Sequence, residues 1–444
     1  MKLKLHWQIL IALGIALIVG LLTSKSGITF GSMYWAPFGD NQENVFNVAY
    51  QFYDFFGTLF LNALKMIIVP LVVSSIICGV ASTGGGRDFG RLGGKTLVYY
   101  LGTSLVAILI GLFLVNAIAP GLENGQGVAD KLGLHADTES VTANVSDRGA
   151  RDFVDIFIRM VPTNVFAAAA DNGQMLGLIF FSLLFGFFMM AINEKGRDLL
   201  KNLWQAVFQV MMKVTDFILM FAPIGVFALL ARTVSQTGFD AFEPLAKFFM
   251  TVVAALGIHF LLTMPLVLMF VARVRPWRHY VAMAPALLTA FSTASSSATL
   301  PITMDCVRDR AGVSNRVTSF VLPLGATVNM DGTALFECVA AMFIAQAYGL
   351  ELTFGVQFII VVTALLTSIG VAGIPKASLV AIMVILGAIG LPAEGIGLIL
   401  AVDRILDMSR TAVNIFGDSV GAIVIAKTEG EKEVLAVPAA QQTS

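Results

Sequence analysis

Long apolar runs recur along the chain and are separated by short polar loops. In the first 272 residues the runs cover about residues 7–23, 53–81, 97–119, 174–192, 203–231 and 247–272. A helix needs about 20 mainly apolar residues to cross the hydrocarbon core of a bilayer. The pattern therefore predicts six transmembrane helices in this part of the chain.

Three of the loops between these runs are rich in Lys and Arg, whereas the intervening loops are not. Their basic residues are Arg87, Arg91, Lys95, Lys195, Arg197, Lys201, Arg273, Arg275 and Arg278. Because short basic loops are retained on the cytoplasmic side of a membrane, we expect these three loops to be cytoplasmic. The amino terminus and the end of the sixth run are then inside.

The next apolar segment does not fit a simple crossing. Another basic cluster starts at Arg308 after only about 25 moderately apolar residues, and one crossing cannot have both ends inside. The segment also contains three serines, at residues 295–297, followed by Pro301. A helix facing lipid would not tolerate this polar stretch, so we predict a re-entrant helical hairpin.

The rest of the chain repeats this arrangement from the opposite side. A seventh crossing is expected over about residues 318–346, interrupted by N-M-D-G-T at 329–333. The apolar region 351–394 is too long for one crossing and is broken at 368–375, which predicts a second hairpin. The eighth crossing ends near Ala426, with the carboxy terminus inside.

The predicted fold is thus an all-α polytopic membrane protein with eight transmembrane helices and two re-entrant hairpins. Two hairpin-plus-helix units of opposite orientation form an inverted repeat, and secondary transporters hold substrate and ions at the interface of such repeats.

Composition and charge support the membrane assignment. The chain is 57% hydrophobic and only 13% charged, against about 25% charged residues in soluble domains, which excludes a typical soluble enzyme. A net charge of -1 gives no basic field for nucleic acid. The three cysteines show neither metal-binding nor disulfide spacing.

Charged residues lie inside the otherwise apolar eighth crossing. A charge at the bilayer centre costs about 2.5 to 3.5 kcal/mol on insertion scales, so these side chains must face protein, water or ligand. Residues spaced 4, 3, 4 and 4 apart fall on one stripe of the helix, namely Asp403, Asp407, Arg410, Asn414 and Asp418.

This stripe suits a substrate that carries both charges. The planar guanidinium of Arg410 can grip a carboxylate with two hydrogen bonds, and Asp407 can neutralise an ammonium group. The stripe therefore predicts an acidic amino acid site. The alternative is an Asp407–Arg410 ion pair that only locks helices together.

The interruption of the seventh crossing is rich in oxygen ligands. Asn329, Asp331 and Thr333 surround Gly332, and Asp418 offers a second carboxylate. Carboxylates with freed backbone carbonyls form a hard site suited to Na⁺. Alternatively, Asp331 only accepts hydrogen bonds that repair the kink.

Other polar residues in the crossings are more ambiguous. Glu337 follows Thr333 by four residues and so lies on a similar face of the seventh crossing. Because desolvation disfavours its charged form, Glu337 is a candidate proton carrier. The alternative is a structural hydrogen bond. The hydroxyls of Tyr100, Thr103 and Ser104 carry no assignment on their own, since such groups bond back to their own helix. His259 is interpreted as a core residue.

Four motifs in this order, S-S-S-A-T-L-P, N-M-D-G-T, A-G-I-P and D-M-S-R-T-A-V-N-I-F-G-D, resemble those of the dicarboxylate/amino acid:cation symporters. This family includes the excitatory amino acid transporters and their prokaryotic homologues. The resemblance implies a homotrimer in which a transport domain moves like an elevator against a scaffold. The implied segments are scaffold 1–81 and 124–235, transport domain 82–123 and 236–427, and cytoplasmic tail 428–444.

The resemblance also implies residue roles. Arg410 and Thr333 would hold the substrate side-chain carboxylate, Asp407 and Thr411 the amino group, and Asn414 and Ser296 the α-carboxylate, giving the substrate set Ser296, Thr333, Asp407, Arg410, Thr411 and Asn414. The resemblance implies ten Na⁺ ligands: Tyr100, Thr103, Ser104, Asn329, Met330, Asp331, Ser368, Ile369, Asn414 and Asp418. Of these, Met330, Ser368 and Ile369 would bind through their backbone.

Two positions discriminate within the family. Neutral amino acid members lack an arginine matching Arg410, and dicarboxylate members lack the aspartate matching Asp407. Glu337 is similar to the glutamate linked to proton and potassium coupling in eukaryotic members. We therefore expect a symporter of L-glutamate and/or aspartate driven by Na⁺ and/or H⁺, with K⁺ as a further candidate ion. A C4-dicarboxylate or neutral amino acid symporter is the alternative.

The chain also departs from the family pattern. Ala294 and Met408 stand where other members place an additional arginine, and Arg404 occurs instead, about 120° around the helix from the substrate arginine. Lys376 and Ser378 stand where relatives often have glycine. These departures leave the choice between aspartate and glutamate open.

Other function classes fit less well. An ion channel would need a pore lining without tight ligands. A nucleotide-driven pump would need a P-loop, which requires glycine where Phe89 stands. A hydrolase would need a motif such as H-E-x-x-H, which does not occur, or a histidine near the serine run, and none stands there in the sequence. The expected location is the plasma membrane, as in a prokaryotic inner membrane, with both termini cytoplasmic.

Overall fold

The computed structural model describes most of the chain, and the described part is predominantly helical. It covers residues 5–25, 28–30, 33–35, 37–81, 87–132, 134, 158, 160–170, 175–238, 240, 242–350, 352–370, 377–392 and 395–435. The α-helices are α1 (Leu5–Leu22), α2 (Gln42–Ala81), α3 (Arg87–Ile118), α6 (Val165–Ala170), α7 (Met175–Met189), α8 (Glu194–Met220), α9 (Ala222–Thr237), α10 (Phe242–Ile258), α11 (Met264–Phe270), α12 (Pro276–Thr293), α13 (Ser296–Asp305), α14 (Asn315–Val328), α15 (Asp331–Ala347), α16 (Phe354–Gly370), α17 (Ala377–Ile389) and α18 (Ile396–Thr428).

Strands are short and few in these described segments. Two antiparallel pairs are formed by β1 (Ile28–Phe30) with β2 (Met33–Trp35) and by β3 (Leu122–Glu123) with β4 (Gln126–Gly127). The helical prediction is therefore confirmed.

Several helices are long and apolar enough to cross a bilayer. Within the described residues these are Gln42–Ala81, Arg91–Ile118, Phe242–Phe270 and Asn315–Ala347, with α8 and α9 as a fifth span if they are counted together. The predicted number of eight crossings stays a prediction.

The run predicted at 203–231 is not one straight helix. It is divided between α8 and α9, which meet at an angle of 54°. Phe221 separates the two helices, and a proline lies at the start of α9. Because proline lacks a backbone N–H, this position favours a break.

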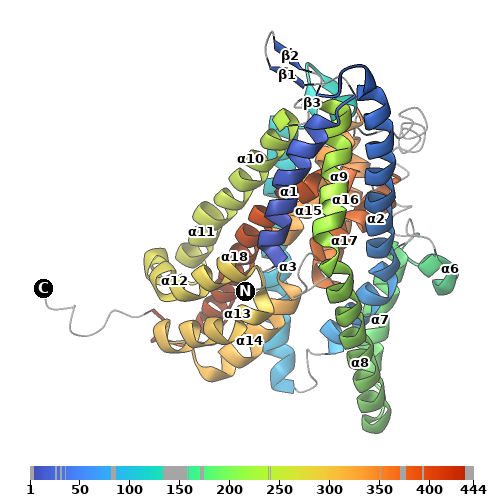
Figure 1. Ribbon diagram of the computed structural model, residues 1–444. Coiled ribbons are helices and arrows are strands. Elements are labelled where there is room, and N and C mark those ends of the chain that lie inside the picture. Colours follow the sequence, from blue (N-terminus) through green and yellow to red (C-terminus); the bar gives the residue numbers. More distant parts are fainter. Residues whose placement is uncertain are drawn as a thin grey trace, which may run out of the picture.

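The helices pack in two groups that follow the sequence only in part. In one group α9 packs against α1 and α2, and α2 packs against α7 and α8. In the other, α3 packs against α10 and α15, and α18 packs against α10, α12, α14 and α15. Figure 1 shows the first group on the right, and α10 to α14 with α18 on the left. Helices α16 and α17 contact both groups.

Both predicted hairpins are present as pairs of packed helices. In the first, α12 and α13 are joined at Ala294, which has a left-handed backbone with φ of 50°, and Ser295 caps α13 by accepting a hydrogen bond from the Ala298 backbone N–H. In the second, α16 packs against α17, and the connecting residues 371–376, including Lys376, lie outside the described part. The re-entrant placement of both hairpins stays a prediction.

The segment after α18 forms hydrogen bonds with the first turns of α3 and α12. The carboxylate of Glu429 accepts hydrogen bonds from Arg91 (2.6 Å) and Lys95 (2.7 Å) at the start of α3. These bonds, that of Lys95 first, hold the pKa of Glu429 below its usual value. The backbone oxygen of Leu435 accepts a hydrogen bond from Arg278 of α12. Three predicted cytoplasmic segments thus lie at the same end of the molecule.

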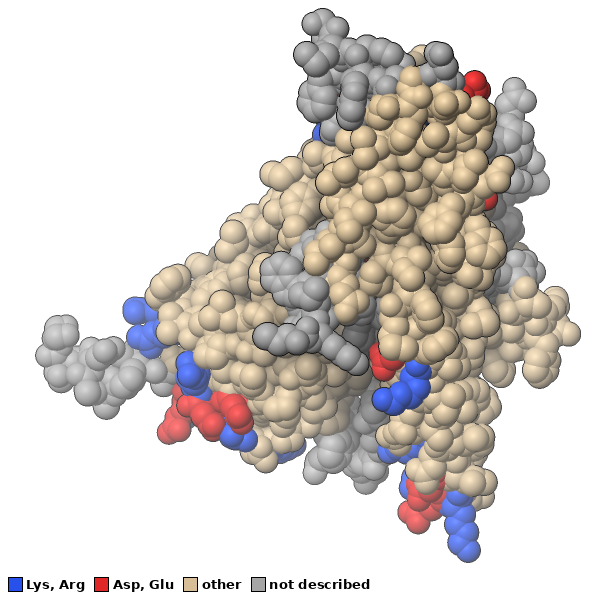
Figure 2. Space-filling model, in the orientation of Figure 1, with Lys and Arg blue, Asp and Glu red and all other residues tan. Residues whose placement is uncertain are grey.

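Charged side chains gather at this end. In Figure 2 the blue and red atoms lie mainly over the lower end of α8 and around α12 to α14, while the rest of the visible face is mostly tan. The first turns of α8 carry Lys195, Arg197 and Lys201. The separation of charged and apolar surface is typical of a protein placed across a membrane.

We expect replacement of Gly225 by alanine to destabilise the packing of α9 on α2. A Cβ atom at Gly225 would lie 2.2 Å from Cγ of Phe60, so a ring or a helix must move. Overpacking of this kind costs about 1–3 kcal/mol, and the unfolding temperature of the detergent-solubilised protein should fall. Gly257→Ala is the control, because no heavy atom lies within 4 Å of its added Cβ. Equal losses in both variants would contradict this packing.

Candidate functional site

The seventh predicted crossing is interrupted where the sequence places N-M-D-G-T. Helix α14 ends at Val328, Asn329 and Met330 have non-helical backbone, and α15 begins at Asp331. The last carbonyls of α14 and the first N–H groups of α15 therefore lack helical partners. The helix dipoles add partial negative charge at the end of α14 and partial positive charge at the start of α15.

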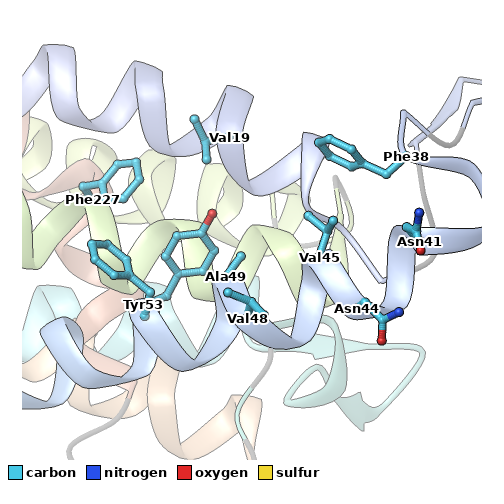
Figure 3. A pocket seen from close by; sticks show the side chains of 10 residues that line it. Val19, Phe38, Asn41, Asn44, Val45, Val48, Ala49, Tyr53 and Phe227 are labelled. Carbon is cyan, nitrogen blue, oxygen red and sulfur yellow. The ribbon is translucent and has the colours of Figure 1, made fainter.

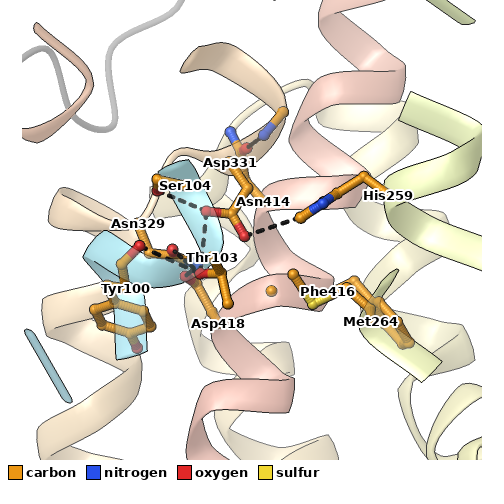
Figure 4. A network of polar contacts seen from close by, with 12 residues as sticks. Tyr100, Thr103, Ser104, His259, Met264, Asn329, Asp331, Asn414, Phe416 and Asp418 are labelled. Atoms are coloured by element: carbon orange, nitrogen blue, oxygen red, sulfur yellow. Dashed lines mark hydrogen bonds and ion pairs between the residues drawn. The ribbon is translucent and has the colours of Figure 1, made fainter. Parts of the chain in front are cut away.

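Asp331 lies at the centre of a polar network in this break. Its side chain is completely buried. Ser104 of α3 donates a hydrogen bond to Oδ1 (2.6 Å), and Thr103 Oγ1 lies 3.3 Å from the same atom. His259 Nε2 lies 3.2 Å from the other oxygen, Oδ2. Figure 4 shows these side chains converging on the carboxylate of α15 from two other segments, α3 and the turn that contains His259.

Helix α18 completes the network. Asn329 donates to Asp418 Oδ1 (2.9 Å), and Asn414 Oδ1 accepts from the backbone N–H of Gly332 (2.8 Å). The approach is close: a Cβ at Gly325 would lie 2.5 Å from both Asp418 Oδ1 and the Tyr100 hydroxyl. We call this group the oxygen cluster; it consists of Tyr100, Thr103, Ser104, Asn329, Asp331, Asn414 and Asp418.

The oxygen cluster has the chemistry of a site for a hard monovalent cation. Among the described residues, neither Asp331 nor Asp418 has a Lys or Arg partner, although both are buried. A buried carboxylate without a cationic partner is costly, so a bound cation would stabilise the pair. The described part holds no group of three or more His, Cys, Asp or Glu side chains placed for a metal ion. The other oxygens of the cluster belong to neutral hydroxyl and amide groups, and hard oxygen ligands of this kind suit Na⁺.

The charged stripe of α18 forms a second site next to the oxygen cluster. Nη2 of Arg410 donates to Asp403 Oδ1 (2.9 Å) and to Asp407 Oδ1 (3.0 Å), as the spacing predicts. Arg404 also reaches Asp407, with 3.9 Å between Nη1 and Oδ2. Two arginines and two aspartates therefore balance each other in charge.

Arg410 is buried, but two of its three nitrogens have no hydrogen-bond partner. It is only 1% exposed, yet its Nε and Nη1 atoms have no hydrogen-bond partner. The guanidinium carbon lies 3.8 Å from the ring centroid of Phe336, which fixes its plane through a cation–π contact. Buried donors of this kind are costly when unpaired, so an oxygen ligand is expected beside them.

The other predicted substrate residues lie on α18 or on helices that pack against it. Asn414 donates to Thr333 Oγ1 (3.0 Å), which links α18 to α15. Thr411 is buried and bonds back to the carbonyl of Asp407 (2.8 Å). Ser296 is buried at the start of α13, a helix that packs against α18.

Glu337 directly follows Phe336, whose ring contacts Arg410, and its side chain is completely buried. Its Oε2 accepts a hydrogen bond from Thr367 of α16 (3.0 Å), and Oε1 has no partner. The side chain therefore connects α15 with the second hairpin.

The predicted backbone ligands lie at helix ends. Met330 precedes α15, and its sulfur accepts a hydrogen bond from Asn414 (3.2 Å). Ser368 and Ile369 fall in the last turn of α16, where carbonyls lack helical partners. Ser378 is buried in the first turn of α17 with its hydroxyl unpaired.

A large pocket on the described surface lies elsewhere. It lies between α1, α2 and α9 (Figure 3). Its volume is about 830 Å³, and its lining residues include Val19, Val45, Phe52 and Phe227. The lining has two amides, Asn41 and Asn44, but no charged side chain, so this pocket does not suit a zwitterion.

Comparison with known proteins identifies the family. The model of the sodium:dicarboxylate symporter family matches residues 5–428. The chain belongs to the sodium:dicarboxylate symporter family. Because this family transports solutes, the chain is a membrane transporter and not an enzyme. The resemblance stated from the four motifs is thereby confirmed.

Relatives within the sodium:dicarboxylate symporter family match over most of their length. A proton/sodium-glutamate symport protein of Bacillus caldotenax is 37% identical over 437 residues, covering 97% of this chain and 96% of the relative. The proton/glutamate-aspartate symporter of Escherichia coli (strain K12) is 35% identical, covering 96% and 93%. Human excitatory amino acid transporter 3 is also 35% identical, covering 85% and 79%.

Two neighbours of the sites carried no signal in the sequence of this symporter. The sequence favours a core residue at His259, because its partner Asp331 lies 72 positions further along the chain. Phe336 looks like any core aromatic beside Glu337, and only the fold places its ring against Arg410.

Proposed function

We propose that this protein is a symporter that carries acidic amino acids, L-glutamate and/or aspartate, together with Na⁺ or H⁺ across a membrane. The observation that carries the proposal is Arg410, a buried cation with two unpaired N–H-bearing nitrogens beside the carboxylate of Asp407. The names of the Bacillus caldotenax and Escherichia coli relatives support the same substrate class.

The substrate would bind along α18. Arg410, helped by Thr333, takes the side-chain carboxylate, because a guanidinium fork matches carboxylate geometry. Asp407 and Thr411 take the ammonium group. The α-carboxylate then lies toward Asn414 and toward Ser296 at the tip of the first hairpin.

Charge balance explains why cations would travel with this substrate. The arginines and aspartates of the stripe already balance, and an acidic amino acid adds one net negative charge. The oxygen cluster contributes two further buried carboxylates. Cations bound there lower the electrostatic cost of loading the site. We propose Asn329, Asp331, Asn414 and Asp418 as Na⁺ ligands, with Tyr100, Thr103 and Ser104, and with the backbone of Met330, Ser368 and Ile369.

We also propose that the two helix groups act as separate bodies. The group of α1, α2, α7, α8 and α9 would form the scaffold of a homotrimer, and α3 with α10 to α18 would move as the transport domain. The site residues lie in α3 and from α13 to α18, and none of them lies in α1, α2, α7, α8 or α9, which supports this division. Both termini would be cytoplasmic in a plasma membrane.

The test is uptake of labelled glutamate, aspartate and succinate into proteoliposomes under imposed Na⁺, H⁺ and K⁺ gradients. Accumulation of the two amino acids above equilibrium, driven by a Na⁺ or H⁺ gradient, is expected. Equilibration without accumulation would indicate a channel, and accumulation of succinate alone would indicate a dicarboxylate carrier; either result overturns the proposal.

We expect Glu337→Gln to alter the pH or K⁺ dependence of uptake while leaving substrate binding intact. Glutamine keeps the size of the side chain and an oxygen that can accept the hydrogen bond from Thr367, but it cannot gain or lose a proton. Uptake should be measured against external pH and internal K⁺, with the exposed Glu243→Gln as control. If both dependences persist in Glu337→Gln, its assignment as proton carrier is wrong.

A further inference from the structure

His259 lies in an irregular turn of the long helical span from α10 to α11. Residues His259–Thr263 form a π-helical turn, in which the Met264 backbone N–H bonds to the His259 carbonyl. Such turns are rare and occur frequently at functional sites. The imidazole is completely buried and reaches the oxygen cluster in Figure 4.

The imidazole and the hydroxyls of α3 hold opposite oxygens of one carboxylate. An ionised carboxylate only accepts hydrogen bonds, so Nε2 of His259 is the donor to Asp331 Oδ2, at 3.2 Å. Ser104 donates to Oδ1. On the α18 side the space is closed, since a Cβ at Gly417 would lie 2.9 Å from Oδ2. The carboxylate is therefore restrained at both oxygens.

The restraint decides which atoms can face a cation. Thr103 Oγ1 lies 3.3 Å from Asp331 Oδ1 and 3.5 Å from Asn329 Oδ1. These three oxygens form one side of the oxygen cluster, and His259 lies on the other side of the carboxylate.

We propose that His259 is a positioning residue that orients the Asp331 carboxylate for cation binding. This inference rests on the proposed Na⁺ site at Asp331. His259 acts through the ligand and does not touch the cation. Loss of a partner that orients a metal ligand typically weakens metal binding about 10- to 100-fold, so the effect should be measurable.

The experiment measures binding of labelled glutamate to the purified full-length protein as a function of NaCl, with choline chloride keeping ionic strength constant. In His259→Phe, which keeps a ring but has no N–H, we expect the half-saturating Na⁺ concentration to rise about tenfold. Glutamate affinity at saturating Na⁺ should stay within about twofold of wild type. A merely structural role would not separate the two quantities.

Two amide variants keep the test decisive if His259→Phe does not fold. Glutamine places an N–H near the position of Nε2, whereas asparagine is too short to do so. We expect His259→Gln to keep nearly wild-type Na⁺ dependence and His259→Asn to lose it. Equal Na⁺ dependence in these two variants would overturn the proposal.

His279 provides a matched control. It is also completely buried, and its Nε2 lies 2.9 Å from Ser419 Oγ of α18. His279→Phe should leave the half-saturating Na⁺ concentration unchanged. If it raises that concentration as much as His259→Phe does, general loss of packing is the cause and the proposal is overturned.

Asp331→Asn separates this inference from the function on which it rests. If Asp331→Asn leaves the Na⁺ dependence unchanged, the proposed cation site is wrong. If Asp331→Asn raises the Na⁺ requirement and His259→Phe does not, the site stands and only the role of His259 is rejected.

Discussion

Uptake of glutamate and aspartate should fall at least about 25-fold when Arg410 is replaced by methionine. Removing one partner of a buried, hydrogen-bonded charge pair costs about 2–5 kcal/mol, and each 1.4 kcal/mol is a factor of ten. Arg410 is 1% exposed, so water cannot replace it as the partner of a substrate carboxylate. The measurement is uptake into proteoliposomes, corrected for the amount of folded protein, with serine and alanine tested as substrates that do not need the guanidinium.

Two variants separate the chemistry of Arg410 from its effect on folding. Arg410→Lys keeps the charge but loses the planar fork, so we expect it to recover little of the lost uptake. Arg232→Met is a matched control, because Arg232 also pairs with an aspartate, Asp54 (3.1 Å), and lies over a tyrosine ring, but between α9 and α2. Unaltered glutamate and aspartate uptake in Arg410→Met would remove the basis of the proposed substrate.

Replacing Asp331 by asparagine should raise the Na⁺ concentration needed for half-maximal uptake by about tenfold or more. The change keeps the size of the side chain and an oxygen that can accept the hydrogen bond from Ser104. It removes one of the two negative charges of the oxygen cluster and leaves only that of Asp418. Interactions with a charged group contribute about 1.5–3 kcal/mol each, which corresponds to this range.

The measurement is initial uptake rate against external Na⁺ at fixed membrane potential. Asp309→Asn is the control for loss of a carboxylate, since Asp309 is exposed and pairs with Arg308. A Na⁺ dependence in Asp331→Asn that matches wild type would mean that Asp331 only repairs the kink between α14 and α15.

The elements that the sequence predicted well are those where polar groups interrupt apolar helix. The serines at the start of α13, the break at Asn329 and the charges on α18 are costly in a membrane, and such a cost leaves few structural solutions. The helix pairs α12–α13 and α16–α17, the interrupted helix and the common face of Asp403, Asp407 and Arg410 are present in the structure, while the re-entrant placement of the two pairs stays a prediction.

Other features depend on contacts that local patterns do not contain. The position of Arg404, about 120° around α18, left its role open, but its long side chain still brings Nη1 to 3.9 Å from Asp407. The bend between α8 and α9 lies within one continuous apolar run. The partner of His259 is set by the packing of three segments, and no spacing rule connects them.

The tie between Glu429 and the start of α3 has a consequence for biosynthesis. Arg91 and Glu429 are 338 positions apart, and at roughly 5–20 residues per second the ribosome needs roughly 17 to 68 seconds to make the intervening chain. During that interval the nascent α3 has to wait in the translocon or bilayer with its basic side chains unpaired. The contacts around α3 are therefore completed only after α18 and the residues that follow it have been synthesised.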